Sequence, residues 1–108
     1  MERQKQEQLI IVLLENKHRY LAGEDVTKGI LNKILLHPRE VFASEIEHRA
    51  AALICVNNHS CGNQEPLQED YRVTERLVEV GILVSIHVLD HVIVGGENYA
   101  SFADKGRL

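Results

Sequence analysis

Two uninterrupted apolar runs constrain the fold of this chain more than any other feature. Leu9–Leu14 is a run of six apolar residues rich in strand formers, and residues 52–56 form a second run of the same kind. Runs without polar alternation are typical of strands that lie inside a sheet. A polar segment follows each run, so we expect two buried strands that each end at a loop.

A first helix is predicted to start at Pro38 and to end near Arg49. Proline suits the first helical position, where its missing N–H costs nothing. Phe42, Ile46 and Ala50 then recur at the spacing of one helix face, which predicts that this face is buried.

A second helix is expected after Pro66, because Val73, Leu77 and Val80 mark an inward stripe. Gly81 would end this helix as a C-terminal cap.

The remaining segments favour strands. Residues 20–26 predict one near the start, and residues 82–88, 91–94 and 99–102 are strand-like, with residues 95–98 as a hairpin turn between the last two. The pattern of residues 27–37 leaves helix and loop open. The alternation predicts an α/β fold, a mixed sheet with helices packed on its faces.

Composition limits the classes of protein to consider. A chain of 108 residues with 44% hydrophobic content suits one domain, residues 1–108. The formal net charge of -4 disfavours nucleic-acid binding, which usually needs a basic surface. The polar start does not resemble a signal peptide, and Leu9–Leu14 is too short to cross a bilayer. With only two cysteines, no disulfide framework is expected, and a cytoplasmic location follows as an expectation.

The segment from Asn57 to Asp70 is the candidate functional site. It connects a buried strand to the following helix, where open α/β sheets characteristically form their sites. Asp70 lies three residues before Val73 and seven before Leu77, so we expect it on the inward face of the helix. Two interpretations stay open: a carboxylate that stabilises the first helical turn, or a metal ligand.

Several separated blocks carry a resemblance to a known family. In order along the sequence they are residues 9–14, 37–42, 57–70, 74–77, 89–95 and 99–102. Together they resemble the JAB/MPN domain of the RadC family over nearly the whole chain. The resemblance implies a JAMM metallopeptidase-like fold, related to the cytidine-deaminase-like sandwiches. Compared with longer family members, the resemblance leads us to expect a domain without their N-terminal helical region.

The resemblance also implies a zinc site. The family holds zinc with a His-x-His pair and an aspartate eleven residues after the second histidine, which here are Asn57, His59 and Asp70. The family's motif serine, three residues before that aspartate, is Leu67 here. Its general base, a glutamate at the start of the first strand, matches Glu7.

These departures predict an altered centre. Catalytic zinc needs three protein ligands and an open position for water, and Asn57 offers a neutral amide where the family has imidazole. Leu67 has no hydroxyl to stabilise an oxyanion. We therefore expect zinc binding that is weak or absent. Two hypotheses follow: an impaired zinc-dependent hydrolase of the isopeptidase or metallopeptidase type, or a catalytically inactive scaffold that binds a protein partner or dimerises.

Other polar residues near these blocks have alternative interpretations. Cys61 could replace the missing ligand, but sliding the motif to His59 and Cys61 places Arg72 where the aspartate is needed. Cys55, inside an apolar run, is expected in the core.

The remaining histidines are divided by their expected positions. His18, His37 and His48 are expected to be exposed. His87 and His91 are predicted to share one face of a strand region, and Asp90 with His91 could support a site or simply satisfy hydrogen bonds at a strand end.

Overall fold

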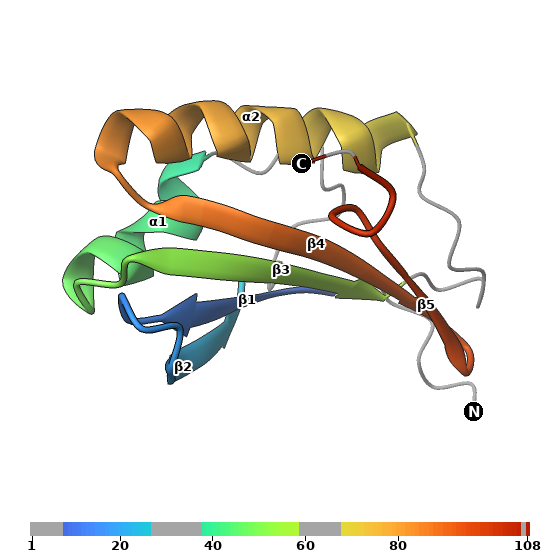
Figure 1. Cartoon of the computed structure of the whole chain (residues 1–108), viewed down its shortest axis with the longest axis horizontal. Coiled ribbons are helices and arrows are strands. Elements are labelled where there is room, and N and C mark those ends of the chain that lie inside the picture. The colour runs from blue at the N-terminus through green and yellow to red at the C-terminus, as the bar shows by residue number, and fades with distance from the viewer. Residues whose placement is uncertain (1–7, 27–37, 59–67, 107) are drawn as a thin grey trace.

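Apolar strands form the centre of a five-stranded mixed sheet in the computed structural model, which describes residues 8–26, 38–58, 68–106 and 108 (Figure 1). The strands are β1 (Leu9–Leu14), β2 (Tyr20–Asp25), β3 (Ala52–Asn58), β4 (His87–Gly95) and β5 (Asn98–Ser101), in the sheet order β2-β1-β3-β4-β5. β3 pairs parallel with β4, and the other neighbours pair antiparallel. The predicted α/β class and mixed sheet are confirmed. The segment of residues 27–37 lies outside the described residues.

Two helices cover the sheet, α1 (Pro38–Glu47) and α2 (Gln68–Val84). Val41 of α1 and Leu77 of α2 belong to the same buried cluster as Ile11 of β1 and Leu53 of β3. Leu53 pairs with Leu13, which is two residues after Ile11 on β1, so Ile11 and Leu53 lie on one face of the sheet. The core therefore lies between one face of the sheet and both helices. Within the described part of the chain, neither helix has the length and apolar character needed to cross a membrane.

Both helices end in the same backbone motif. Arg49 and Ser85 adopt positive φ values of 56° and 62°. After α1, the Ala50 N–H donates to the Glu45 carbonyl at 2.8 Å, and after α2 the Ile86 N–H donates to the Gly81 carbonyl at 2.9 Å. These bonds satisfy carbonyls that helix ends leave unpaired, as in a Schellman motif.

Gly81 lies inside α2, so the prediction that it caps the helix was wrong. The helix continues to Val84, which also corrects the strand expected from residue 82 onward. A Cβ atom at Gly81 would lie 2.4 Å from the Ile86 carbonyl oxygen. Glycine is therefore required here because the chain turns back across the helix to begin β4.

The buried face of α1 also differs from its prediction. Phe42 and Ala50 are buried as expected, but Ile46 is 59% exposed and its neighbour Glu45 is completely buried. Among the described residues, neither carboxylate oxygen of Glu45 has a hydrogen-bond partner. The pKa of Glu45 is raised to about 7, mainly by desolvation; nearby Glu24 contributes to the rise, whereas the backbone and His48 oppose it. Burial, with the charge of Glu45, also raises the pKa of the Cys55 thiol.

Replacing Gly81 with alanine should destabilise the protein, although the same change in an open helix is usually favourable. The added methyl group must displace the Ile86 carbonyl, so we expect the free energy of unfolding to fall by about 1–3 kcal/mol. Urea denaturation measures this change. Ser85→Gly is the control, because it relaxes a positive φ and should not destabilise. A Gly81→Ala variant as stable as the parent would contradict the close approach.

Glu45 should make the protein less stable as the pH rises. The pKa of Glu45 is raised from 4.5 in the unfolded chain to about 7 in the fold. Between these values the unfolded chain has released the proton that the folded protein retains, so stability falls from about pH 4.5 to about pH 7. Glu45→Gln should remove this part of the pH dependence and stabilise the protein at pH 8 by about 1–2 kcal/mol. Thermal denaturation across this range measures both effects, and an unchanged slope would count against a buried protonated carboxyl.

Candidate functional site

Asn57 lies at the carboxyl end of β3, with its side chain completely buried. It pairs with Leu9 of β1 and with Ile93 of β4. Its Nδ2 donates to the carbonyl oxygens of Gln8 and Asn58, each at 3.1 Å. The amide is therefore held by the backbone at the start of β1 and the end of β3.

Asp70 lies in the first turn of α2 and is also completely buried, which confirms the expected inward orientation. One turn later, the Thr74 hydroxyl donates to the Asp70 carbonyl at 2.8 Å. The same hydroxyl oxygen contacts His91 Nδ1 of β4. Because the hydroxyl proton is directed to the carbonyl, His91 carries its proton on Nδ1 and donates it to Thr74. We call Asp70, Thr74 and His91 the polar chain of the site.

His91 is fixed by packing as well as by this hydrogen bond. Its ring stacks on Phe102 with ring centroids 4.7 Å apart, and Tyr71 of α2 packs on the same Phe102 at 5.1 Å. His91 is buried whereas His87 is exposed, so the prediction that they share one face was wrong. A register shift between Leu53 and Ile54 of β3 changes the alternation of β4 between the two histidines.

Asp90 has a structural role on the other face of β4. Its carboxylate accepts hydrogen bonds from the His91 N–H at 2.7 Å, the Ser101 hydroxyl at 2.6 Å and the Ala103 N–H at 2.9 Å. These bonds join β4 to β5 and to the turn that follows. Of the two interpretations of Asp90 and His91, the geometry favours hydrogen bonding at a strand end.

Several expected site residues lie outside the described residues: Glu7, His59, Cys61 and Leu67, together with the exposed histidine expected at position 37. His18 and His48 are exposed as predicted, and Cys55 is in the core.

The described members of the expected zinc set do not by themselves fit a zinc centre. Asp70 is an ordinary zinc donor, but Asn57 is a neutral amide whose nitrogen donates to two carbonyls. Among residues 8–26, 38–58, 68–106 and 108, no group of three His, Cys, Asp or Glu side chains could hold a metal.

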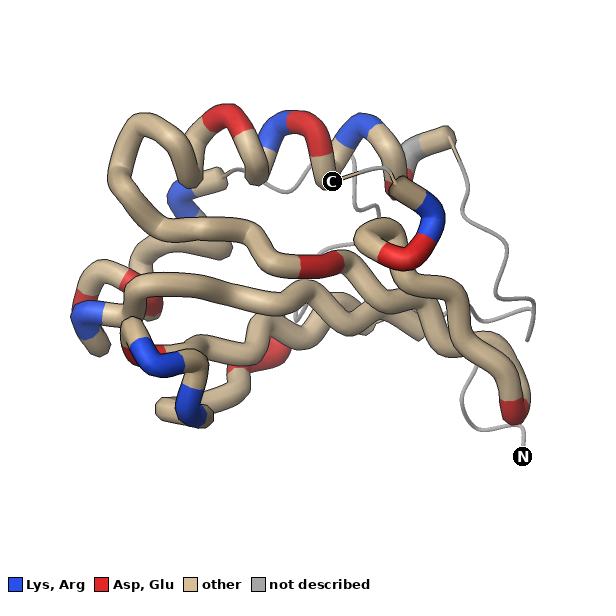
Figure 2. The backbone as a smooth tube through the Cα atoms, in the orientation of Figure 1, with Lys and Arg blue, Asp and Glu red and all other residues tan. Residues whose placement is uncertain are grey.

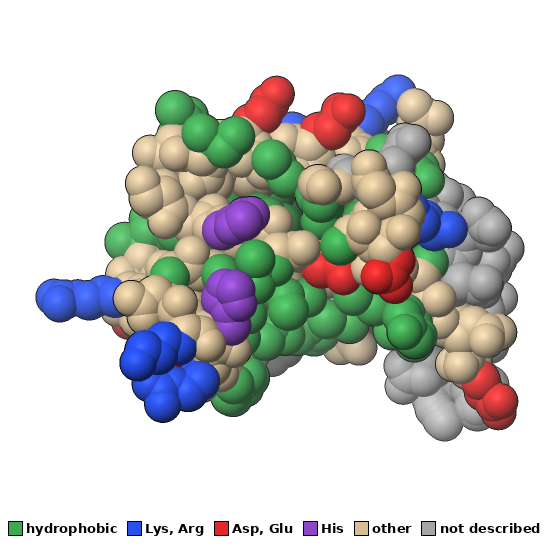
Figure 3. Space-filling model, in the orientation of Figure 1, with side chains coloured by type: hydrophobic (Ala, Val, Ile, Leu, Met, Phe, Trp, Pro, Cys, Tyr) green, Lys and Arg blue, Asp and Glu red, His purple; other side chains and the backbone are tan. Residues whose placement is uncertain are grey.

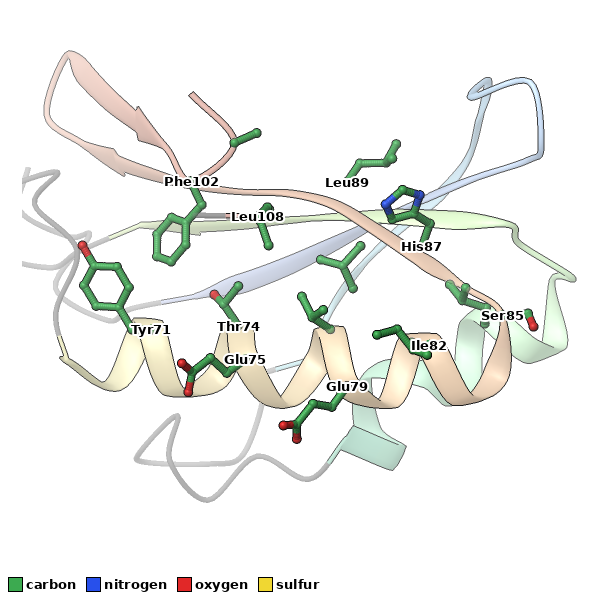
Figure 4. Close-up of a pocket in the computed structure, with 15 residues that line it drawn as sticks. Tyr71, Thr74, Glu75, Glu79, Ile82, Ser85, His87, Leu89, Phe102 and Leu108 are labelled. Carbon is green, nitrogen blue, oxygen red and sulfur yellow. The ribbon is translucent and has the colours of Figure 1, made fainter. Parts of the chain in front are cut away.

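A groove of about 900 Å³ lies between α2 and β4 (Figure 4). Its apolar lining includes Val88 and Phe102, and Glu79 points away from the strands at its outer side. Thr74 is the member of the polar chain that reaches this groove, whereas Asn57 and Asp70 do not line it. The groove is therefore distinct from the expected zinc site.

Comparison with known proteins identifies the family. The family model described as a RadC-like JAB domain matches residues 1–107. Proteins named UPF0758 protein are similar over nearly all of the chain: one from Syntrophotalea carbinolica is 44% identical over 104 residues, covering 96% of this chain and 46% of that protein. One from Methanosarcina mazei is 44% identical over 106 residues, covering 98% and 46%, respectively.

The fold and the buried residues at the β3–α2 junction thus define a JAB-type α/β domain. The chain belongs to the RadC-like JAB domain family. It spans less than half of the length of the curated relatives described above.

Sequence reasoning did not anticipate the contact between Thr74 and His91. Thr74 was considered only as part of the block of residues 74–77, and His91 mainly with its sequence neighbour Asp90. One signal for this contact was available: a polar residue lies on each of two buried faces. Buried polar groups in proteins are almost always hydrogen-bonded, so the two residues could be expected to bind each other.

Removing the Thr74 hydroxyl should destabilise the junction of α2 and β4. Thr74→Val keeps the branched shape but loses both hydrogen bonds of Oγ1, so we expect the free energy of unfolding to fall by about 1–3 kcal/mol. Thr74→Ser keeps the hydroxyl and should cost less. Chemical denaturation of the two variants measures the difference, and a valine variant more stable than the serine variant would argue against this hydrogen-bonded role.

Proposed function

We propose that this chain is a RadC-like JAB domain in which the family's zinc-dependent hydrolase centre is impaired. The reaction class that the resemblance implies is peptide or isopeptide hydrolysis. When bound in such a centre, zinc supplies a water of lowered pKa that serves as the nucleophile. The proposed site consists of Asp70 and His59 as ligands and Glu7 as the base, with Asn57 at the altered ligand position.

The environment of Asn57 is the observation that supports impairment. An imidazole at this position would offer a strong zinc donor, whereas the amide nitrogen of Asn57 donates to the Gln8 and Asn58 carbonyls at 3.1 Å. Gln8 directly follows the proposed base in the sequence. Asn57 thus serves to hold the start of β1 against the end of β3, a structural role that does not require a metal.

The role of Asp70 follows from its burial. A fully buried carboxylate is stabilised only by partners or a cation, and its position in the first turn of α2 also exposes it to the favourable end of the helix dipole. Thr74 holds the Asp70 carbonyl, and through it His91 supports this turn. In the proposed centre these two residues position the backbone that carries Asp70.

Restoring the missing imidazole should restore zinc binding. We expect Asn57→His to bind one zinc ion at least about 100-fold more tightly than the parent chain, because it regains a third strong protein donor. Isothermal titration calorimetry of metal-free protein with zinc chloride measures the affinity, and the zinc-induced rise in melting temperature provides a second measure.

Asn58→His is the matched control for this experiment. Asn58 is the next residue of β3, so its side chain points to the opposite face of the sheet. The control should bind zinc no better than the parent. Tight one-to-one binding by the parent chain would refute impairment, and equal gains in both histidine variants would show that position 57 is not special.

A non-catalytic scaffold is the second candidate function. The sheet face opposite the helices favours it, because this face presents aliphatic side chains that are only partly buried. In this case the domain acts by binding another protein molecule, and zinc has no part in its function.

A further inference from the structure

One edge of β4 is open along the first part of the strand. β5 pairs with β4 only from Val92 to Gly95, and after Ser101 the chain forms a turn that leaves the sheet. Within the described part of the chain, no strand lies beside residues 87–89 on that side of β4. The strand row that β5 begins is therefore empty next to the start of β4.

The backbone of Val88 points to this open edge. The His87 N–H donates to the Ala51 carbonyl at 3.0 Å, so the backbone groups of His87 face β3. Backbone groups of successive strand residues point to opposite edges, and those of Val88 therefore face outward. Further along, the His91 carbonyl also faces outward, because it accepts a hydrogen bond from the Phe102 N–H after β5. A strand edge of this kind can pair with another chain.

The groove between α2 and β4 gives access to this edge. His87, Val88 and Leu89 follow one another on β4, so their side chains point alternately to the two faces of the sheet. All three nevertheless line the groove. Side chains from both faces can line one groove only where the edge between them is accessible. The open edge of β4 therefore forms part of the groove wall.

The groove has the length of a short extended peptide. Along α2 its lining extends from Tyr71 to Ile82, about 16 Å at a helical rise of about 1.5 Å per residue. An extended chain rises about 3.3 Å per residue, so about five peptide residues match this length. In strand addition, backbone hydrogen bonds hold the peptide and alternate side chains enter pockets beside the edge. Here the apolar surface of Val78, Val88 and Phe102 would receive those side chains.

The outer side of the groove is acidic. Glu75 and Glu79 line it and are both exposed, whereas its described lining contains no lysine or arginine. α2 also has two basic residues, Arg72 and Arg76, but neither lines the groove (Figure 2). In Figure 3 acidic side chains project along α2 at the top of the view, above hydrophobic ones. The groove thus combines an apolar floor with a negatively charged border.

Basic side chains complement this combination. Lysine and arginine place their apolar stems along apolar surface and their charged ends at its border. A second copy of this chain matches the groove poorly, because its net charge is -4 and its other edge strand, β2, contains Glu24 and Asp25. Pairing of β2 with the open edge of β4 would place these carboxylates near Glu75 and Glu79. Charge therefore favours a different protein as the occupant.

From these observations we propose that the groove binds an extended segment of a partner protein that contains both aliphatic and basic residues. The segment adds to the sheet as a strand beside Val88, and its basic side chains reach Glu75 and Glu79. Neither Asn57 nor Asp70 lines the groove, so this binding site is independent of the proposed zinc centre.

An NMR titration of the isotope-labelled full chain tests this proposal. The probe is an acetylated and amidated pentapeptide of alternating valine and lysine, added in the presence of EDTA. We expect saturable shifts of the amide signals of residues 87–89, with a dissociation constant below about 1 mM. The same peptide with glutamate in place of lysine should bind at least about 5-fold more weakly. A peptide methylated on every backbone nitrogen should not bind, because it keeps the side chains but has no N–H groups to donate to the strand edge.

Charge reversal tests the acidic border directly. Glu79→Lys should weaken binding of the lysine peptide at least about 5-fold and strengthen binding of the glutamate peptide, because it replaces an attraction with a repulsion. Glu47→Lys is the matched control. Glu47 is an exposed residue at the end of α1 and does not line the groove, so the same change in net charge should leave peptide binding unaltered.

Three results would overturn the proposal. The first is the absence of saturable shifts at residues 87–89 up to about 1 mM lysine peptide. The second is equal binding of the methylated and unmethylated peptides, which would exclude strand addition. The third is a shift of the same signals with protein concentration alone, which would assign the groove to a second copy. Because EDTA is present throughout, failure here leaves the zinc-site proposal untouched, and the reverse also holds.

Discussion

The pairing of β3 with β1 on one side and β4 on the other determines the position of every site residue described here. Antiparallel pairing brings Asn57 next to Leu9 and lets its amide bind the Gln8 carbonyl. Parallel pairing with β4 sets His91 beside Cys55, on the face covered by α2, where Thr74 can reach it. Because these contacts depend on strands far apart in sequence, the site can form only when the three central strands have assembled.

Two buried polar residues illustrate different relations between burial and hydrogen bonding. Asn57 is fully buried and its amide donates to two carbonyls, so it fits its position in the sheet. Glu45 is equally buried, but its carboxylate oxygens have no partner among the described residues. The first residue stabilises the junction of two strands, whereas the second introduces an electrostatic cost into the helix layer. Burial alone therefore does not identify which polar residue supports the fold.

Local pattern predicted much of this fold because apolar runs and helix spacing reflect burial directly. β1 has the predicted bounds, and Asp70 faces inward as its spacing to Leu77 required. The spacing within α1 did not predict that Glu45 is buried and Ile46 exposed. A hydrophobic pattern assigns the more apolar of two neighbouring residues to the core, and the actual rotation of the helix differs from this assignment. The register shift beside Leu53 and the close approach at Gly81 arise from contacts between distant segments, which no local pattern records. Of the expected zinc residues, Asn57 and Asp70 have described positions, and the zinc-binding role of the whole set stays a prediction.

Asp90 has a further consequence for how the C-terminal part of the domain opens. Its carboxylate binds β4 itself, the Ser101 hydroxyl of β5 and the Ala103 N–H of the following turn. The Phe102 N–H between these last two residues donates to the His91 carbonyl, so three consecutive residues, Ser101 to Ala103, are each hydrogen-bonded to β4. Loss of any one leaves the others in place. The final hairpin and its turn therefore open as one cooperative unit, and their amide protons exchange with solvent together rather than by gradual fraying from the chain end.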